Sequence, residues 1–190
     1  EEVAAVIADF DGDNRNDLVV GSGGADFYGE ADPLLDAYYQ NLPTGFQKGS
    51  LPENFANTSV LRPFDFDGDG DLDLFLGNRS ITGNFGAYPK CYLLENVDGD
   101  FQVVEEFPGG ELGMVTDALW SDFDQDGSED LIVVGEWMAP VFLRNDKGTF
   151  RRVDLNLPSG LWQRITPFDI DGDGDLDYLL GNWGENSKFT

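Results

Sequence analysis

The sequence predicts an all-β fold built from repeats of short antiparallel strands. Four acidic segments of nine residues begin at residues 9, 65, 122 and 169, which places them 56, 57 and 47 residues apart. A period of about 50 residues is typical of repeat architectures. Short runs rich in apolar residues stand on both sides of each segment, as expected for strands. Helical periodicity is absent from the sequence, except for a short stretch between Pro33 and Tyr39.

Each repeat is predicted to begin with two apolar strands joined by its acidic segment. The first strands are expected at residues 3–8, 59–64, 115–120 and 162–168, and the second strands at residues 18–21, 74–77, 131–135 and 178–181. The second strands are apolar throughout, which indicates that both of their faces are buried. The third of them has one additional residue before its glycine, which indicates a β-bulge.

Two further strands complete the repeat. A third run ends in Asn at residues 38–41, 91–96 and 141–145, and a more polar run then opens at Phe46, Phe101 or Phe150. Gly-containing turns between the two runs are typical of β-hairpins. Four strands that are apolar inside and polar at the outer edge are the pattern of a β-propeller blade. The sequence therefore predicts a β-propeller of four-stranded antiparallel blades, with three full blades and the first half of a fourth.

The acidic segments have the donor spacing of a metal-binding loop. Each has Asp at positions 1, 3, 5 and 9, with Asn or Gly at position 6, where the chain must turn sharply. Side chains at positions 1, 3 and 5 of such a turn converge, position 7 can offer its carbonyl, and position 9 can complete the shell. Calcium takes about six to eight oxygen ligands, whereas magnesium needs a small octahedral shell and keeps several waters. Four loops in phase therefore favour calcium over magnesium and over simple solvated turns.

An EF-hand is the main rival interpretation. That motif requires a bidentate Glu at position 12 and helices on both sides of the loop. Position 12 here is apolar in every segment, and it lies inside a β-like run: Val20, Leu76, Val133 and Leu180. The segments are therefore predicted to connect strands, with the ninth residue closing the metal site.

The sequence resembles the FG-GAP/VCBS repeat family. The resemblance is carried by Asp65-Phe-Asp-Gly-Asp-Gly-Asp-Leu-Asp73 with Leu-Phe-Leu-Gly-Asn78 after it, by the three corresponding segments, and by Leu143-Arg-Asn-Asp-Lys-Gly-Thr-Phe150. Members include the integrin α-subunit propeller and many secreted bacterial proteins. The resemblance covers nearly the whole chain. It implies a propeller with calcium between the first and second strands of each blade, and an extracellular or cell-surface protein whose signal sequence lies upstream of Glu1.

Carried over position by position, the resemblance implies up to four calcium ions, one in each loop. The implied side-chain ligands are Asp9, Asp11, Asp13 and Asp17; Asp65, Asp67, Asp69 and Asp73; Asp122, Asp124, Asp126 and Asp130; and Asp169, Asp171, Asp173 and Asp177. The implied carbonyl ligands at position 7 are Arg15, Asp71, Ser128 and Asp175. We expect each ring of carboxylates to be buried and its calcium to be structural.

We expect residues 1–190 to form one propeller segment. The repeats are predicted at about residues 1–57, 58–113, 114–161 and 162–190, the last being partial. Family propellers usually have about seven blades. The remaining blades are therefore expected from a longer chain or from another copy, because an open half-ring would expose apolar faces and sheet edges.

Composition excludes several classes of function. The chain has 37 acidic and 11 basic residues, a net charge of -26 and no His, and 19 of the acids lie in the four segments. Such a polyanion repels nucleic acid and anionic lipid, and no apolar run approaches the ~20 residues that cross a bilayer. The absence of His excludes Ser-His-Asp and Cys-His nucleophilic systems. The single Cys91 lies in an apolar run and is expected to be a buried thiol.

The predicted ligand surface lies on the face opposite the calcium loops. In a propeller, that face carries the connections at residues 22–36, 78–90, 136–140 and 158–163. These connections and the end of the fourth repeat hold aromatic residues and one Arg, which suit a protein or glycan ligand, although the rings can instead pack between blades. The residues are Phe27, Tyr28, Arg79, Phe85, Tyr88, Trp137, Trp162 and Trp183.

Two classes of function follow. The first is an extracellular, calcium-stabilised propeller for adhesion or for binding a protein or glycan. The alternative is the propeller of a secreted polysaccharide-acting enzyme, or an accessory domain of one, which needs paired acids outside the metal loops. The candidate acids have no supporting pattern, and no catalytic residue is assigned: Asp26, Glu30, Asp32, Glu105 and Glu106.

Overall fold

The first two repeats each form a four-stranded antiparallel sheet with its strands in sequence order. The computed structural model describes residues 2–84, 86–97 and 99–184. The first sheet consists of β1 (Glu2–Ala8), β2 (Asp17–Ser22), β3 (Ala37–Leu42) and β4 (Gly45–Lys48). The second consists of β5 (Asn57–Phe64), β6 (Asp73–Ser80), β7 (Tyr92–Val97) and β8 (Asp100–Val103). The predicted four-strand repeat is therefore confirmed in both.

The third repeat has the same strand order, and the hairpin of the fourth repeat is joined to it. Its strands are β9 (Met114–Ser121), β10 (Asp130–Met138), β11 (Val141–Asp146) and β12 (Thr149–Val153). The fourth repeat contributes β13 (Gly160–Phe168) and β14 (Asp177–Asn182). β13 also pairs with β10, through Glu136 with Leu161 and Met138 with Gly160. The all-β prediction is confirmed, and the number of blades stays a prediction.

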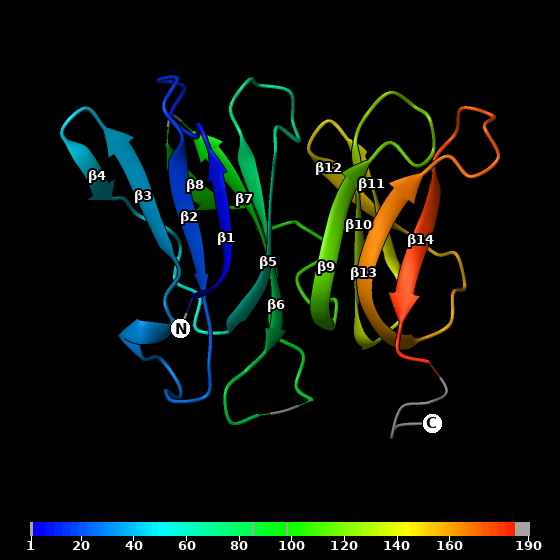
Figure 1. The fold of residues 1–190 in the computed structure, drawn as a ribbon, viewed down its shortest axis with the longest axis horizontal. Helices are drawn as coiled ribbons and strands as arrows, with labels where there is room; N and C mark the ends of the chain where they lie inside the picture. Colours follow the sequence, from blue (N-terminus) through cyan, green and yellow to red (C-terminus); the bar gives the residue numbers. More distant parts are fainter. Residues whose placement is uncertain (1, 85, 98, 185–190) are drawn as a thin grey trace.

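The sheets stand side by side with β1, β5, β9 and β13 as neighbours, which we call the inner strands (Figure 1). Alternate residues of the second strands point into different cores, as the period of two in a strand requires. Leu74 and Leu76 of β6 pack toward the first sheet, whereas Phe75 packs toward the third. The buried residues of β10 divide in the same way between the second sheet and β13. The prediction of two buried faces is confirmed for these two strands, and Cys91 is buried as expected.

The same prediction is wrong for the fourth repeat. The side chain of Leu179 in β14 is 62% exposed, because one face of this hairpin packs on the third sheet and the other face has no sheet against it among the described residues. β2 is intermediate, with Val19 buried and its neighbours half-buried. Burial on both faces is therefore a property of the two middle repeats.

The bulge predicted in the second strand of the third repeat is wrong, because β10 pairs regularly with β9 from Asp130 to Val134. A bulge lies instead in the inner strand of every repeat. The register of each first pair shifts by one residue on the inner strand. The additional residues are Val3, Ser59, Thr116 and Gln163. A glycine adjoins each bulge on the second strand; at Gly77 a Cβ would lie 2.8 Å from Val115 Cγ1, so the glycine allows the next inner strand to approach. We call these four residues the bulge residues.

The possible helix between Pro33 and Tyr39 is only a 3₁₀ turn at Asp32–Leu34. The chain leaves the turn because Asp36 is buried and accepts a hydrogen bond from Ser22 N at 2.7 Å, after which β3 begins. Over the residues that the structure describes, no helix has the length and apolar character required to cross a bilayer.

Candidate metal centres

The four acidic loops lie together along one edge of the sheets, at the top of Figure 1, where each joins the first strand of a repeat to the second. Position 9 of each loop is the first residue of the second strand: Asp17, Asp73, Asp130 and Asp177. The structure thus holds one end of every loop on a strand and leaves the rest of the loop to turn back over it. We call this edge the loop face.

Three carboxylates converge in each loop, with one oxygen of each within 4.8 Å of the others. The groups are Asp9, Asp11 and Asp13; Asp65, Asp67 and Asp73; Asp122, Asp124 and Asp130; and Asp169, Asp171 and Asp177. Positions 1 and 3 belong to every group, position 5 to the first alone, and position 9 to the other three. Each donor set consists of oxygen atoms, which suits a hard cation such as calcium.

The carboxylate at position 1 fixes the turn. It accepts a hydrogen bond from the backbone N–H of position 6, at 2.7 Å for Asn14 on Asp9 and at 2.9–3.1 Å in the other loops. Position 6 has φ between 65° and 108° in all four loops, the left-handed turn that its Asn or Gly predicts. The N–H of position 7 donates to the carboxylate at position 5. A ligand role for the carbonyls of position 7 stays a prediction.

Position 4 is a second left-handed residue, which was not among the predictions from the sequence. Its φ is 71° at Gly12, 82° at Gly68 and 76° at Gly172. In the third loop the same conformation is imposed on Gln125, whose φ is 59°. The glycines at position 4 of the other three loops were the available signal for this second turn.

The carboxylate at position 9 connects its loop to the sheet. Asp17, Asp73 and Asp130 are fully buried. In these three residues one oxygen accepts from the N–H of position 2, at 3.0–3.3 Å, and the other from the N–H of an Asn at the end of the third strand, at 2.7–2.8 Å. Burial, together with the carboxylates of the same loop, raises the pKa of Asp73 to about 7 and that of Asp130 to about 6, against the effect of these hydrogen bonds. A bound cation would offset this accumulation of negative charge.

The same asparagines join successive loops. The amide of Asn96 donates to Phe10 O of the first loop at 2.6 Å and to Leu72 O of its own loop at 2.9 Å. Asn145 repeats the arrangement, donating to Phe66 O at 2.8 Å and to Glu129 O at 3.1 Å. From the sequence these asparagines were predicted only to end the third strands, because the contact that matters is with the preceding repeat.

The loops differ in charge and are more open than predicted. Arg15 pairs with Asp13 in the first loop, and Arg144 pairs with Asp124 and Asp126 in the third at 3.0 and 2.7 Å. The expectation of buried rings is wrong for positions 1, 3 and 5, which are half-buried or exposed in every loop. They reach the surface because the loop turns over the sheet edge, so only position 9 is enclosed, and in the fourth loop Asp177 is half-buried.

The residues predicted for the opposite face are divided between surface and core. The side chains of Tyr28, Tyr88, Trp137, Trp183 and Phe27 are exposed. Trp162 packs against the core around Ile132 and Phe142, and Phe85 lies outside the described residues. The acids considered for catalysis are all exposed: Asp26, Glu30, Asp32, Glu105 and Glu106.

The comparison with protein families identifies the same repeat. The sequence model of the FG-GAP-like repeat matches residues 65–133 and 122–180, two overlapping segments that begin at the second and third acidic loops and each extend to the second strand of the next repeat. No curated protein matches the chain. The first repeat lies outside the match, yet it has the same strand order and the same hydrogen bonds at positions 1 and 9.

Proposed function

Because the chain belongs to the FG-GAP-like repeat family, we propose that it is part of an extracellular β-propeller that is stabilised by calcium and binds a protein or a glycan. FG-GAP repeats occur in propeller modules for adhesion and binding, and they are typical of extracellular proteins. The observation that carries the proposal is the loop geometry, repeated four times, in which converging carboxylates share one edge of the sheets.

The propeller itself is supported by the way the sheets meet. Four-stranded antiparallel sheets pack face to face, the first strand of each lies beside the first strand of the next, and the polar fourth strand lies farthest out. Further blades would cover the exposed face of β14 and the exposed Val3 and Ile7 of β1. They would come from a longer chain or from another copy.

Calcium would stabilise this fold without taking part in a reaction. The acids at positions 1, 3, 5 and 9 would hold the ion, which would supply positive charge to carboxylates that otherwise repel one another. Position 9 would transmit the stabilisation to the strands, because its oxygens hold both the loop and the third strand. A cation that binds only the folded loops stabilises the fold by about 2.7 kcal/mol per site at a hundredfold excess over Kd.

The opposite face is the proposed ligand surface. It carries exposed aromatic rings at Tyr28, Trp137 and Trp183, together with Arg79. Exposed aromatic and Arg side chains are enriched where proteins bind partners. Since the loop face is occupied by metal ligands, ligand specificity is assigned to this other end.

The proposal is tested by thermal unfolding and by ligand capture. EDTA is expected to lower the melting temperature, millimolar calcium to restore it, and magnesium to restore it less well. A melting curve that is identical in EDTA and in calcium would contradict the calcium role. Capture of a glycan or protein without turnover supports a binding module, whereas release of shortened products from a polysaccharide would support the enzymatic alternative.

A further inference from the structure

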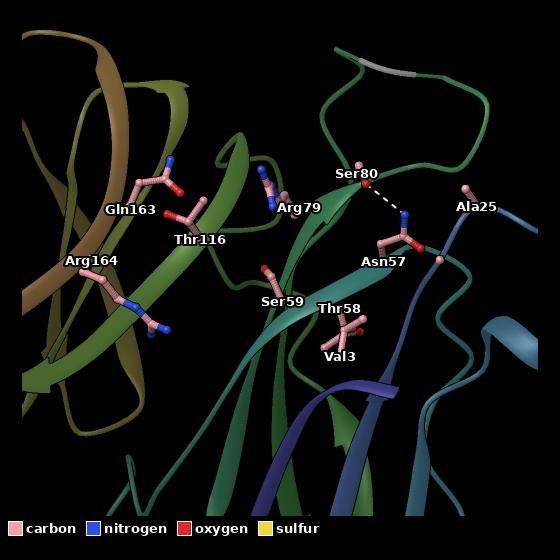
Figure 2. A pocket seen from close by; sticks show the side chains of 11 residues that line it. Val3, Ala25, Asn57, Thr58, Ser59, Arg79, Ser80, Thr116, Gln163 and Arg164 are labelled. Atoms are coloured by element: carbon pink, nitrogen blue, oxygen red, sulfur yellow. Dashed lines mark hydrogen bonds between the residues drawn. The ribbon is translucent and has the colours of Figure 1, made fainter. Parts of the chain in front are cut away.

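A cleft of about 640 Å³ opens between the inner strands at the end opposite the loop face (Figure 2). Figure 2 shows Thr116, Gln163 and Arg164 on one side and Asn57 and Ser80 on the other, with Arg79 and Ser59 between them. The volume lies within the range of small-molecule sites, about 300–1,000 Å³. The lining residues come from all four repeats, so the cleft exists only because the repeats are side by side.

The bulges build this cleft. All four bulge residues, Val3, Ser59, Thr116 and Gln163, line it. Arg79 is also an additional residue, because β6 shifts register between Asn78 and Ser80 opposite β5. A bulge redirects a side chain away from the regular alternation of a strand, and bulges are over-represented beside functional sites. Five irregularities that converge on one cleft therefore indicate a built site.

The residues that line the cleft differ in charge from the rest of the chain. The protein has 37 acidic residues and a net charge of -26. No Asp or Glu is among the described residues that line the cleft, whereas Arg79 and Arg164 both line it. An even distribution of acids would place about two among its 11 lining residues. The lining itself is thus basic, and the acids that pair with its two arginines, Glu136 and Asp117, lie outside it.

The two arginines are presented differently. Arg79 is fixed by Glu136, which accepts from its Nη2 at 2.8 Å and from its Nε at 3.3 Å, and Gln163 holds the same carboxylate at 3.0 Å. The Arg164 side chain is 76% exposed, and its one ion pair among the described residues is with Asp117 at 3.7 Å. Arg164 therefore keeps donors for a carboxylate, whereas the charge of Arg79 is balanced by Glu136.

The inner strands are poorly suited to bind an extended peptide. A peptide that adds as a strand needs free main-chain groups along an edge. Here Ser59 Oγ donates to Val115 O at 2.6 Å, Thr116 Oγ1 to Trp162 O at 2.8 Å, and Arg62 Nε to Ala118 O at 2.7 Å. Side chains thus occupy carbonyls that an added strand would use. The apolar side chains of the lining are also small, since Val3 and Ala25 are the largest of them.

We propose that this cleft binds a short saccharide that carries a carboxylate, of the uronic acid class. Arg164 would bind the carboxylate, while the hydroxyls and amides of Ser80, Thr116 and Asn57 would meet sugar hydroxyls. The acidic surface around the cleft repels long polyanions, which favours a short ligand with one or few carboxylates. The inference rests on the proposed function in placing the ligand at this end, and it adds the chemical class of the ligand.

The experiment is a calorimetric titration of the calcium-loaded chain with two matched sugars. Cellobiouronic acid and cellobiose differ only in whether the terminal C6 is a carboxylate. We expect the acid to bind at least about tenfold more tightly, and Arg164→Gln to remove that preference. Arg151→Gln makes the same charge change at an exposed site on β12 and is expected to change nothing. Ala25→Glu, at an exposed residue of the cleft, should weaken the acid more than the neutral sugar.

Several outcomes would overturn the inference: equal affinity for the two sugars, no binding of either, or the same effect of Arg164→Gln and Arg151→Gln. Tighter binding of the acidic tripeptide Gly-Asp-Gly, lost in Arg164→Gln, would assign the cleft to a peptide instead. The proposed function is judged separately. It survives if another glycan or a protein is captured by a chain that calcium stabilises, and it fails with the inference if EDTA leaves the melting curve unchanged and nothing is captured.

Discussion

The loop face and the cleft, at opposite ends of the molecule, differ in what recurs from one repeat to the next. On the loop face, positions 1, 3, 5 and 9 are Asp in all four repeats, and the hydrogen bonds from position 6 recur in each. At the cleft, the backbone bulge recurs, but the bulge residues are Val3, Ser59, Thr116 and Gln163. One end keeps both its shape and its side chains, and the other keeps only its shape. Side chains that recur in every repeat hold the repeats together, whereas the bulge residues, which vary, are the ones that can recognise a ligand.

The largest expected effect is at the repeated end, where Asp73→Ala should lower the free energy of unfolding by about 2–5 kcal/mol. The substitution leaves the buried N–H groups of Phe66 and Asn96 without their acceptor and removes a proposed calcium ligand. Urea unfolding in calcium measures the loss. Asp26→Ala removes an exposed acid outside the loops and serves as the control. Equal unfolding midpoints for the two variants would show that position 9 does not anchor the loop.

The next effect compares two equivalent asparagines. Asn96→Ala is expected to cost about 1–3 kcal/mol and to weaken calcium binding to two loops, because its amide holds Phe10 O and Leu72 O. Asn41→Ala should cost less and affect one loop, because among the described residues the Asn41 amide holds only Asn16 O of its own loop. Calcium titration and urea unfolding of both variants measure the difference. Identical losses would mean that the link between loops contributes nothing.

A pH series tests the contribution of the buried carboxyl of Asp36, which lies at the end of the sheet away from the loops. Burial raises the pKa of Asp36 above its ordinary value, against hydrogen bonds from Asn54, Ser22 and Thr58. A raised pKa means that the folded state binds the proton more tightly than the unfolded chain. The stabilisation is therefore complete below the unfolded pKa, about 4, and is lost as the pH rises through the folded pKa.

Asp36→Asn removes this titration. The stability of the parent chain minus that of Asp36→Asn is expected to fall as the pH rises above about 4, and to level off beyond the folded pKa of Asp36. Differences in urea midpoint across the series measure it, and the loop acids, common to both chains, cancel in the subtraction. A difference that rises with pH would show that hydrogen bonds to the carboxylate outweigh its burial.

The smallest expected effect is on the loop face, at the one acidic loop that has a residue other than glycine at position 4. Gln125 has φ of 59° at the position where the other loops have glycine, so Gln125→Gly should raise the free energy of unfolding by about 0.5 kcal/mol. Thermal unfolding in calcium measures it, with Gln102→Gly on β8 as a control that is expected to destabilise. A loss of stability in Gln125→Gly would show that the Gln side chain makes a contribution larger than its backbone strain.

The sequence was sufficient where a structural requirement is local. The Asp spacing, the glycine or asparagine at position 6 and the apolar runs predicted the loops and the strand order of each sheet, because these depend on residues within one repeat. The links made by Asn96 and Asn145 were missed, since their partners lie 86 and 79 residues earlier in the chain. The buried group around Asp36 was missed because its partners Asn54 and Thr58 lie 18 and 22 residues further along the chain, outside any local pattern. The cleft could not be foreseen either, because it needs bulges from four repeats.

The asparagine link also bears on how such a chain can be shortened, extended or recombined. A cut between the first two sheets would separate Phe10 from the amide of Asn96, because the two residues belong to different repeats. The unit that can be exchanged is therefore a loop together with the third strand of the following repeat. Its boundaries do not coincide with those of a single four-stranded sheet. Hybrid chains joined at sheet boundaries should lose one such bond at every junction unless both halves supply the same asparagine and carbonyl.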